Sequence, residues 1–196
     1  MKLKQIEAIL KAEKTIIVSE TSACQWLGNG AAFYPVYNLP KLTKDNIFTM
    51  FDITEEKRDK FYFEERPLPP HINFEDGDDS EQLLERGAIT FYAQGRTLEP
   101  LKTSQGIAFI NTRYLKPFSA GYELYERTTA QGKPYIAVKS GFMLLGIISP
   151  YDLVNETFIN NLDEILKLSR IALFNKQKDD SITDTNTQVK MEDMEV

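Results

Sequence analysis

The sequence predicts an α+β protein built around an antiparallel sheet, and two observations lead to this prediction. Short runs rich in β-branched and aromatic residues recur along the chain, separated by glycine and proline turns, as strands joined by hairpins would be. Amphipathic stretches with helical spacing lie at residues 2–12 and again beyond residue 155. With 196 residues, 42% of them hydrophobic, the chain is large enough to bury a core.

The first sixty residues predict a helix, three strands and two further short helices. Apolar residues at helical spacing indicate the first helix: Leu3, Ile6, Ile9 and Leu10. Three apolar runs then predict strands, "KTIIVSE", "ACQWL" and "AAFYPVY", with "GNG" as the turn between the last two. Thr43 is expected to be the N-cap of a helix that begins at Lys44, and Thr54 to cap one more turn.

The middle of the chain predicts a loop followed by a hairpin. The segment "RPLPPHINFEDGDDSE", residues 66–81, is rich in proline and acid, so we expect an irregular, flexible and solvated loop. The stretch "ITFYAQGRTLEPLKT", residues 89–103, is expected to form a hairpin that turns at Gly95 and Arg96.

From residue 106 the order of the N-terminal elements returns. "GIAFIN" predicts a strand, "TRYLKPF" a short helix, and "YELYERTT", "PYIAVKS" and "FMLLGIIS" three more strands. Asp152 or Asn155 is expected to start a closing helix with a broad apolar stripe. The members of that stripe are Phe158, Leu162, Ile165, Leu166, Leu173 and Phe174.

The repeat is most visible between residues 29–52 and residues 140–163. Compared without gaps, these stretches place Gly141 on Gly30 and keep the same apolar pattern from there to Asp52 and Asp163. A three-stranded meander with one helix cannot bury both of its faces. The sequence therefore predicts two similar units that join their strands into one sheet, with both helices on the same side.

The predicted units are of βαβββ type. Unit one covers residues 1–60, a hairpin insert covers residues 61–105, and unit two covers residues 106–177, all within a single α+β domain, residues 1–177. The remaining residues, 178–196, contain two lysines against six acids, a net charge of −4 out of −6 for the chain. A segment this polar is expected to be a disordered acidic tail.

The order of elements in residues 1–40 and 106–150 resembles that of a single domain of a DNA sliding clamp. In that family the sheets form the outside of a ring, and helices line a channel around duplex DNA. The stretch "AAFYPVYNLPKLTKDNIFTMFDI" is also similar to small uncharacterised proteins encoded by phages and prophages of Gram-positive bacteria. That second resemblance implies no activity and no residue roles.

The clamp resemblance implies that the two leading helices carry positive charge toward DNA, whose affinity for proteins depends on phosphate contacts. Both helices have a net positive charge although the chain is net negative. The nucleic-acid-binding residues that this hypothesis names are Lys4, Lys11, Arg113 and Lys116. The alternative is that these side chains are ordinary solvated positions on helix surfaces.

The sequence carries no recognisable catalytic or metal-binding motif. Cys24 and His71 are the only cysteine and histidine, so neither a zinc cluster nor a disulfide within the chain is expected. Four acids in "FEDGDDSE" could hold Mg²⁺ or Ca²⁺, but their spacing is not that of an EF-hand loop: Asp76, Asp78, Asp79 and Glu81. We expect no metal and no cofactor.

Three hypotheses about function follow. The preferred one is a non-catalytic accessory or interaction protein of phage or prophage origin, linked to DNA metabolism and possessing a protein partner. The second is an acidic protein–protein module that inhibits a host nucleic-acid enzyme, because an acidic chain can compete with DNA for a basic groove. The third is a hydrolase with a carboxylate pair drawn from Glu64, Glu65, Glu123 and Glu126.

The place of action is expected to be the cytoplasm. No apolar run approaches the roughly 18 residues of a membrane span, and the N-terminal residues lack the apolar stretch of a signal peptide. The oligomeric state stays open at this point.

Overall fold

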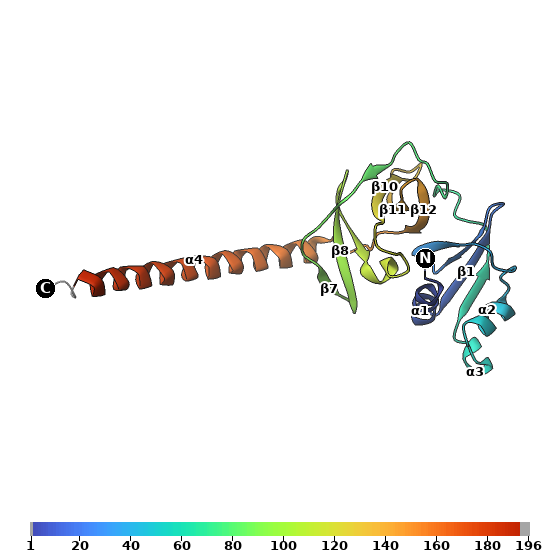
Figure 1. The fold of residues 1–196 in the computed structure, drawn as a ribbon, viewed down its shortest axis with the longest axis horizontal. Coiled ribbons are helices and arrows are strands. Elements are labelled where there is room, and N and C mark those ends of the chain that lie inside the picture. The colour runs from blue at the N-terminus through green and yellow to red at the C-terminus, as the bar shows by residue number, and fades with distance from the viewer. Residues whose placement is uncertain (1, 193–196) are drawn as a thin grey trace. The chain divides into compact units, whose positions relative to one another are not determined.

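A computed structural model gives the fold; it describes the backbone of residues 2–192 and the side chains of residues 2–178. The protein is a mixed α+β fold with a C-terminal helix, as predicted (Figure 1). The chain divides into two compact units, Met1–Asp152 and Leu153–Val196, whereas the sequence predicts one domain that continues to residue 177. We call these unit 1 and unit 2.

Eight strands of unit 1 form the main sheet, in the order β4-β1-β2-β3-β12-β11-β10-β5. Their bounds are Thr15–Glu20 (β1), Gln25–Gly28 (β2), Ala32–Val36 (β3), Tyr62–Glu65 (β4), Gln82–Leu83 (β5), Glu123–Thr128 (β10), Pro134–Ser140 (β11) and Met143–Ile148 (β12). The antiparallel meanders β1–β2–β3 and β10–β11–β12 meet where β3 pairs with β12, and there Phe33 lies opposite Ile147. β4 extends the sheet by pairing parallel to β1.

A second sheet contains four strands. They are β6 (Glu85–Arg86), β7 (Phe91–Ala93), β8 (Arg96–Thr103) and β9 (Gly106–Asn111). The β7–β8 hairpin turns at Gln94 and Gly95, one residue earlier than predicted, because Ala93 pairs with Arg96. Both turn residues have positive φ, 50° and 75°, as a tight two-residue hairpin turn requires.

The position of β9 differs from that of the first strand of a βαβββ unit. β9 pairs along its whole length with β8 in the second sheet, and not with the strands of the main sheet. A hairpin to the preceding strand requires only the short turn at Ser104 and Gln105, so this local pairing is favoured over a distant one. Only the meander β10–β11–β12 of this half of the chain enters the main sheet.

Four short helices belong to unit 1: α1 (Leu3–Glu13), α2 (Lys44–Met50), α3 (Glu55–Arg58) and the 3₁₀-helix η1 (Thr112–Leu115). Thr43 precedes α2 as predicted, and its backbone N–H donates to Asn46 Oδ1 at 2.7 Å, one half of a capping box. Thr54 is the N-cap residue of α3, as predicted, but makes no side-chain capping hydrogen bond. A local capping signal therefore accounts for the start of α2.

One face of the main sheet is covered by helices and by the second sheet, and we call it the helix face. α1 buries Ile6, Ile9 and Leu10 against it. The backbone N–H of Lys2 donates to the Pro117 carbonyl at 2.9 Å, which joins the start of α1 to the end of the η1 segment. Leu101 and Ile110 bring the second sheet into the same core.

The opposite face is covered by residues 66–81, which we call the strap. Leu68, Ile72 and Phe74 pack against a cluster of sheet residues that includes Trp26 and Phe33. Phe74 makes edge-to-face contacts with both rings, at centroid distances of 4.9 Å and 5.7 Å. The expectation of a flexible, solvated loop is therefore corrected, because three apolar side chains in an otherwise polar segment are enough to anchor it.

Unit 2 contains α4 (Glu156–Glu192), a helix of 37 residues. Asn155 is its N-cap, since its side-chain Oδ1 accepts the Phe158 backbone N–H at 2.9 Å. The helical backbone reaches into the range for which the sequence predicts a disordered acidic tail. The side chains of residues 179–196 lie outside the described part, so the tail itself stays a prediction.

Candidate nucleic-acid interface

The concave surfaces with the strongest charge lie around the C-terminal turn of α1, on the helix face. Two pockets, each of about 400 Å³, flank this turn. Lys11 and Lys14 line one of them, and Ala12 and Glu13 line the other. The pockets therefore share one wall, and we call them the lysine pocket and the hairpin pocket.

The hairpin pocket lies between α1, the β7–β8 turn and η1. Its charged lining residues are Glu13, Arg96, Arg113 and Lys116, a net charge of +2. The Arg96 guanidinium lies 3.9 Å from the Glu13 carboxylate and 5.4 Å from the centre of the Tyr151 ring. Arg96 is thereby held in place, while Arg113 and Lys116 are exposed at the rim.

The lysine pocket lies between α1 and the segment that holds α2 and α3. Four lysines line it against the single acid Asp52, a net charge of +3: Lys11, Lys14, Lys57 and Lys60. Ile53 and Phe61 form its apolar floor. Together the two pockets place a net charge of +5 on one surface of a chain whose net charge is −6.

Most of these cations have no acidic partner within the described part of the chain. Lys11 pairs with Glu7 at 2.6 Å, and Arg96 lies near Glu13. No ion pair joins the other five to any described carboxylate: Lys14, Lys57, Lys60, Arg113 and Lys116. The negative end of the α1 dipole favours cations at Lys11 and Lys14 but does not account for those of η1 and α3.

The structure brings together three of the four residues that the sequence names for nucleic-acid binding. Arg113 and Lys116 line the hairpin pocket, and Lys11 lines the lysine pocket. Lys4 is exposed and lines neither. Lys14, Lys57, Lys60 and Arg96 are not among the predicted nucleic-acid-binding residues. Lys57 and Lys60 have acidic neighbours in sequence, and only the fold places them beside α1.

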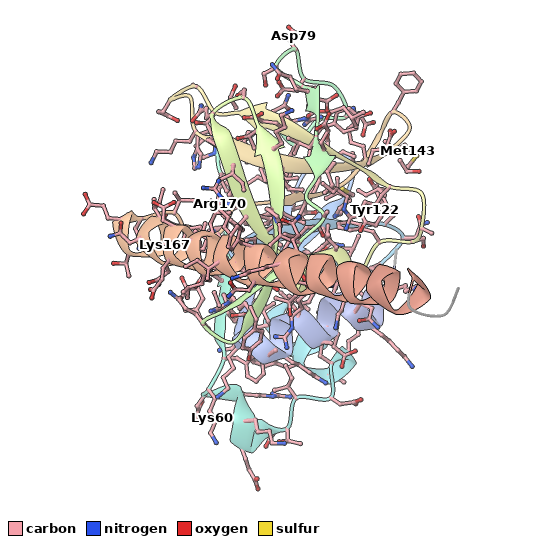
Figure 2. All side chains as sticks on the ribbon, turned by 90° about the vertical axis from the view of Figure 1, so that its left-hand side faces the viewer. Lys60, Asp79, Tyr122, Met143, Lys167 and Arg170 are labelled. Atoms are coloured by element: carbon pink, nitrogen blue, oxygen red, sulfur yellow. The ribbon has the colours of Figure 1, made fainter. Side chains whose placement is uncertain are left out.

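The basic surface and the acidic strap lie at opposite ends of unit 1, as the labelled Lys60 and Asp79 show (Figure 2). Glu81 and several backbone carbonyls of the strap bind cations of the main sheet. Arg127, fully buried on β10, donates to the carbonyl oxygens of Asn73, Glu75 and Asp76 at 2.8–3.1 Å. The guanidinium also pairs with Glu81, and Lys139 donates to that same carboxylate at 2.8 Å.

Three acids of the strap, Asp76, Asp78 and Glu81, accept hydrogen bonds from groups of unit 1, and we call these contacts, with those of Arg127, the clasp. Asp76 accepts the Leu144 backbone N–H at 2.7 Å, and Asp78 accepts from Ser80 and Asn73. Burial alone would raise the pKa values of Asp78 and Glu81, but hydrogen bonds and the nearby cations outweigh it, so both pKa values are lowered. Among the described residues, no group of three or more potential ligands could hold a metal ion.

The four glutamates named for the hydrolase hypothesis lie on two strands that are far apart in the main sheet. Glu64 and Glu65 lie on β4, and Glu123 and Glu126 lie on β10, with five strands of the main sheet between β4 and β10. Glu126 is buried and accepts the backbone N–H of Ser104 at 2.7 Å, so it ties the main sheet to the β8–β9 turn. This arrangement offers no acid pair to a substrate.

The thiol of Cys24 and the imidazole of His71 do not line the same pocket. Cys24 is half-buried at a pocket formed by the strap and the β1–β2 turn, and burial raises the pKa of its thiol above the usual value. Its hydroxyl neighbour is Thr21. His71 is exposed and does not line that pocket. A Cys–His nucleophile is therefore not formed.

Within the described residues, no helix combines the length and apolar character needed to cross a membrane. Comparison with protein-family models, curated proteins and solved structures finds no match to the chain. The similarity to phage and prophage proteins and the resemblance to a sliding-clamp domain therefore stay predictions.

Proposed function

We propose that this protein is a non-catalytic accessory protein that binds the phosphate backbone of nucleic acid through the basic surface at the C-terminal turn of α1. The observation that carries the proposal is the set of five cations, in two adjoining pockets, that have no acidic partner among the side chains of residues 2–178. Unpaired cations that lie close together repel one another, and a polyanion removes that repulsion while it releases counterions.

The topology gives secondary support for a clamp-like arrangement. The two meanders pair through β3 and β12 into one sheet, and α1 and η1 lie on the same face of it. Both elements contribute cations to the basic surface. In this proposal the helix face is turned toward nucleic acid, as the resemblance to a clamp domain implies.

Two features limit how far the likeness to a clamp extends. β9 pairs in the second sheet, and η1 is a single 3₁₀ turn where a clamp domain has a helix. The proposal therefore includes backbone binding on the helix face and does not include encirclement of DNA. A partner in DNA metabolism and a phage origin belong to the same hypothesis.

The second hypothesis is an acidic module that engages a basic partner. Three of the strap acids are not free for such a partner. Asp76, Asp78 and Glu81 are already satisfied by groups of this chain. What is left for such a partner is the exposed acids Glu75 and Asp79 of the strap and the acidic sequence of residues 178–196. Retention of a partner after deletion of residues 178–196 and neutralisation of Glu75 and Asp79 would remove this alternative.

The proposal is tested by a fourfold charge reversal with a matched control. The test variant changes Lys14, Lys60, Arg113 and Lys116 to Glu, and the control changes Lys41, Lys44, Lys102 and Lys133 to Glu. Both alter the net charge by the same amount and at exposed positions. The expected result is loss of duplex DNA binding, measured by fluorescence anisotropy, in the test variant alone. Equal loss in both variants would mean that binding depends only on net charge.

A further inference from the structure

The helix α4 exposes apolar side chains, for which nucleic-acid binding at the basic surface gives no reason. Seven large apolar side chains between residues 159 and 174 are 48–67% exposed: Ile159, Ile165, Leu166, Leu168, Ile171, Leu173 and Phe174. Within residues 153–192, the described part of unit 2, α4 is the only element of secondary structure. Long helices derive most of their stability from packing of an apolar face.

One side of α4 is more continuous than the other. At 100° per residue, Ile159, Leu162, Leu166 and Leu173 fall on one stripe, with Ser169 in the same row. These positions are spaced 3, 4, 3 and 4 residues apart, which is the spacing of a coiled-coil seam. Ile171 lies on the opposite side of the helix. The seam is therefore suited to a second helix.

The charges along α4 indicate which second helix this is. Between residues 156 and 178, the acids Glu156, Asp163 and Glu164 precede the cations Lys167, Arg170, Lys176 and Lys178. Lys167 and Arg170 are labelled on the helix in Figure 2. Two parallel copies would place like charges at the same level. Two antiparallel copies would place the acidic residues 156–166 of each beside the basic residues 167–178 of the other.

We propose that two copies of this chain associate through an antiparallel pair of α4 helices, with the seam of Ile159, Leu162, Leu166 and Leu173 buried between them. Ser169 of each copy then lies at the level of Leu166 of the other copy. Asp163 and Arg170 flank the seam on the same side, so Asp163 of each copy faces Arg170 of the other. The contact is isologous and closes after two copies.

The pairing presents two copies of unit 1 on one assembly. Each copy carries its own basic surface, so a dimer offers two phosphate-binding surfaces to one nucleic acid. Linked binding sites raise the overall affinity without any new contact in either site. The inference itself stands on α4 alone and does not require the proposed nucleic-acid binding.

The first test measures the solution mass of the full-length chain by light scattering across a concentration series. A dimer is the expected result. The Leu166→Glu variant is expected to be monomeric, and Ile171→Glu is its matched control, because both side chains are 50% exposed but only Leu166 lies on the seam. A monomer at all concentrations, a closed ring of more copies, or equal effects of the two variants would overturn the proposal.

The direction of the pair is tested by charge reversal. Asp163→Lys and Arg170→Asp are each expected to weaken the homodimer by at least tenfold, because each creates two repulsive contacts across the antiparallel pair. Mixing the two variants restores two attractive contacts, so the mixture is expected to form a heterodimer. In a parallel pair Asp163 and Arg170 would not face each other, so neither single reversal would weaken the homodimer. Unchanged homodimer affinity of both single variants, or failure of the mixture to associate, would contradict the antiparallel arrangement.

Discussion

Charged residues on the two sides of the main sheet differ in whether they pair with an opposite charge. On the strap face, Arg127 and Lys139 are 0% and 7% exposed, and both pair with Glu81. On the helix face, five cations around the C-terminal turn of α1 remain exposed and lack an acidic partner within the described chain. One side of the main sheet therefore holds charges that are paired within the chain, and the helices on the other side carry cations that are not.

The difference separates charges that the fold needs from charges that it does not. A buried guanidinium must be hydrogen-bonded and paired, because removing it from water costs several kcal/mol. Exposed lysines around a concavity contribute little to stability, and like charges close together reduce it. The strap-face charges are thus explained by folding, while those of the helix face are not, and our proposed function assigns them to a phosphate ligand.

The largest expected effect is that of Arg127→Met. The substitution removes donors from three strap carbonyls and from Glu81, and breaking such a buried pair costs about 3–5 kcal/mol. The measurement is the free energy of unfolding in urea. Lys133→Met is the control, because Lys133 is exposed and such surface changes usually stay within about 0.5 kcal/mol. A loss below about 1 kcal/mol for Arg127→Met would contradict the clasp.

The next effect concerns the apolar anchor of the strap. Phe74→Ala is expected to destabilise the protein by about 2–3 kcal/mol, because it removes two aromatic contacts and leaves Trp26 partly uncovered. Trp26 is the only tryptophan, so its fluorescence should shift to the red. Phe142→Ala is the control, since this ring is 90% exposed. An unchanged spectrum of Phe74→Ala would mean that the strap does not cover the sheet.

Acid should weaken the strap face before the helix face. The pKa values of Asp78 and Glu81 are lower in the folded protein than their ordinary values of 3.8 and 4.5. Their stabilising contribution is therefore complete above about pH 4.5 and is lost as the pH falls through the lowered folded pKa values. Glu81→Gln should be less stable at pH 7 and flatter in its pH dependence below pH 4.5. A parallel pH curve for the variant would exclude Glu81 as the titrating group.

The smallest effect is expected at Lys4. Because Lys4 lines neither pocket, Lys4→Ala should leave the DNA affinity within about twofold and the salt dependence unchanged. Lys116→Ala should reduce the slope of log affinity against log salt by about 1, since it removes one phosphate contact. Isothermal titration at three salt concentrations distinguishes the two. Equal slopes for both variants would place the phosphate contacts elsewhere.

Local signals predicted most of the strands and helix starts. The caps Thr43, Thr54 and Asn155 precede the expected helices, and β11 has the predicted bounds, Pro134–Ser140. The sequence did not predict the pairing partners of β4 and β9. The pairing of β4 with β1 joins distant parts of the chain, and no local propensity encodes it. The pairing of β9 with β8 is local, across a two-residue turn, and the two-unit prediction overlooked it.

The contacts of the strap and the full set of cations in the basic surface could not be predicted from sequence patterns. Proline and acid in residues 66–81 indicate a loop, but the carbonyls that Arg127 binds are backbone groups that any sequence possesses. Arg113 and Lys116 could be named because no acid lies near them in sequence. Lys57 and Lys60 could not, because acids lie beside them in sequence, and only the fold shows that Glu55, Glu56 and Asp59 do not line the pocket.

The salt dependence of duplex DNA affinity for the unaltered chain tests the central claim most directly. If the five unpaired cations each contact one phosphate, the slope of log affinity against log salt should be about −4.5, or 0.9 per contact. That result would show that the charges of the helix face serve a polyanion. No binding at low salt, or a slope near zero, would contradict the account and leave those cations without a ligand.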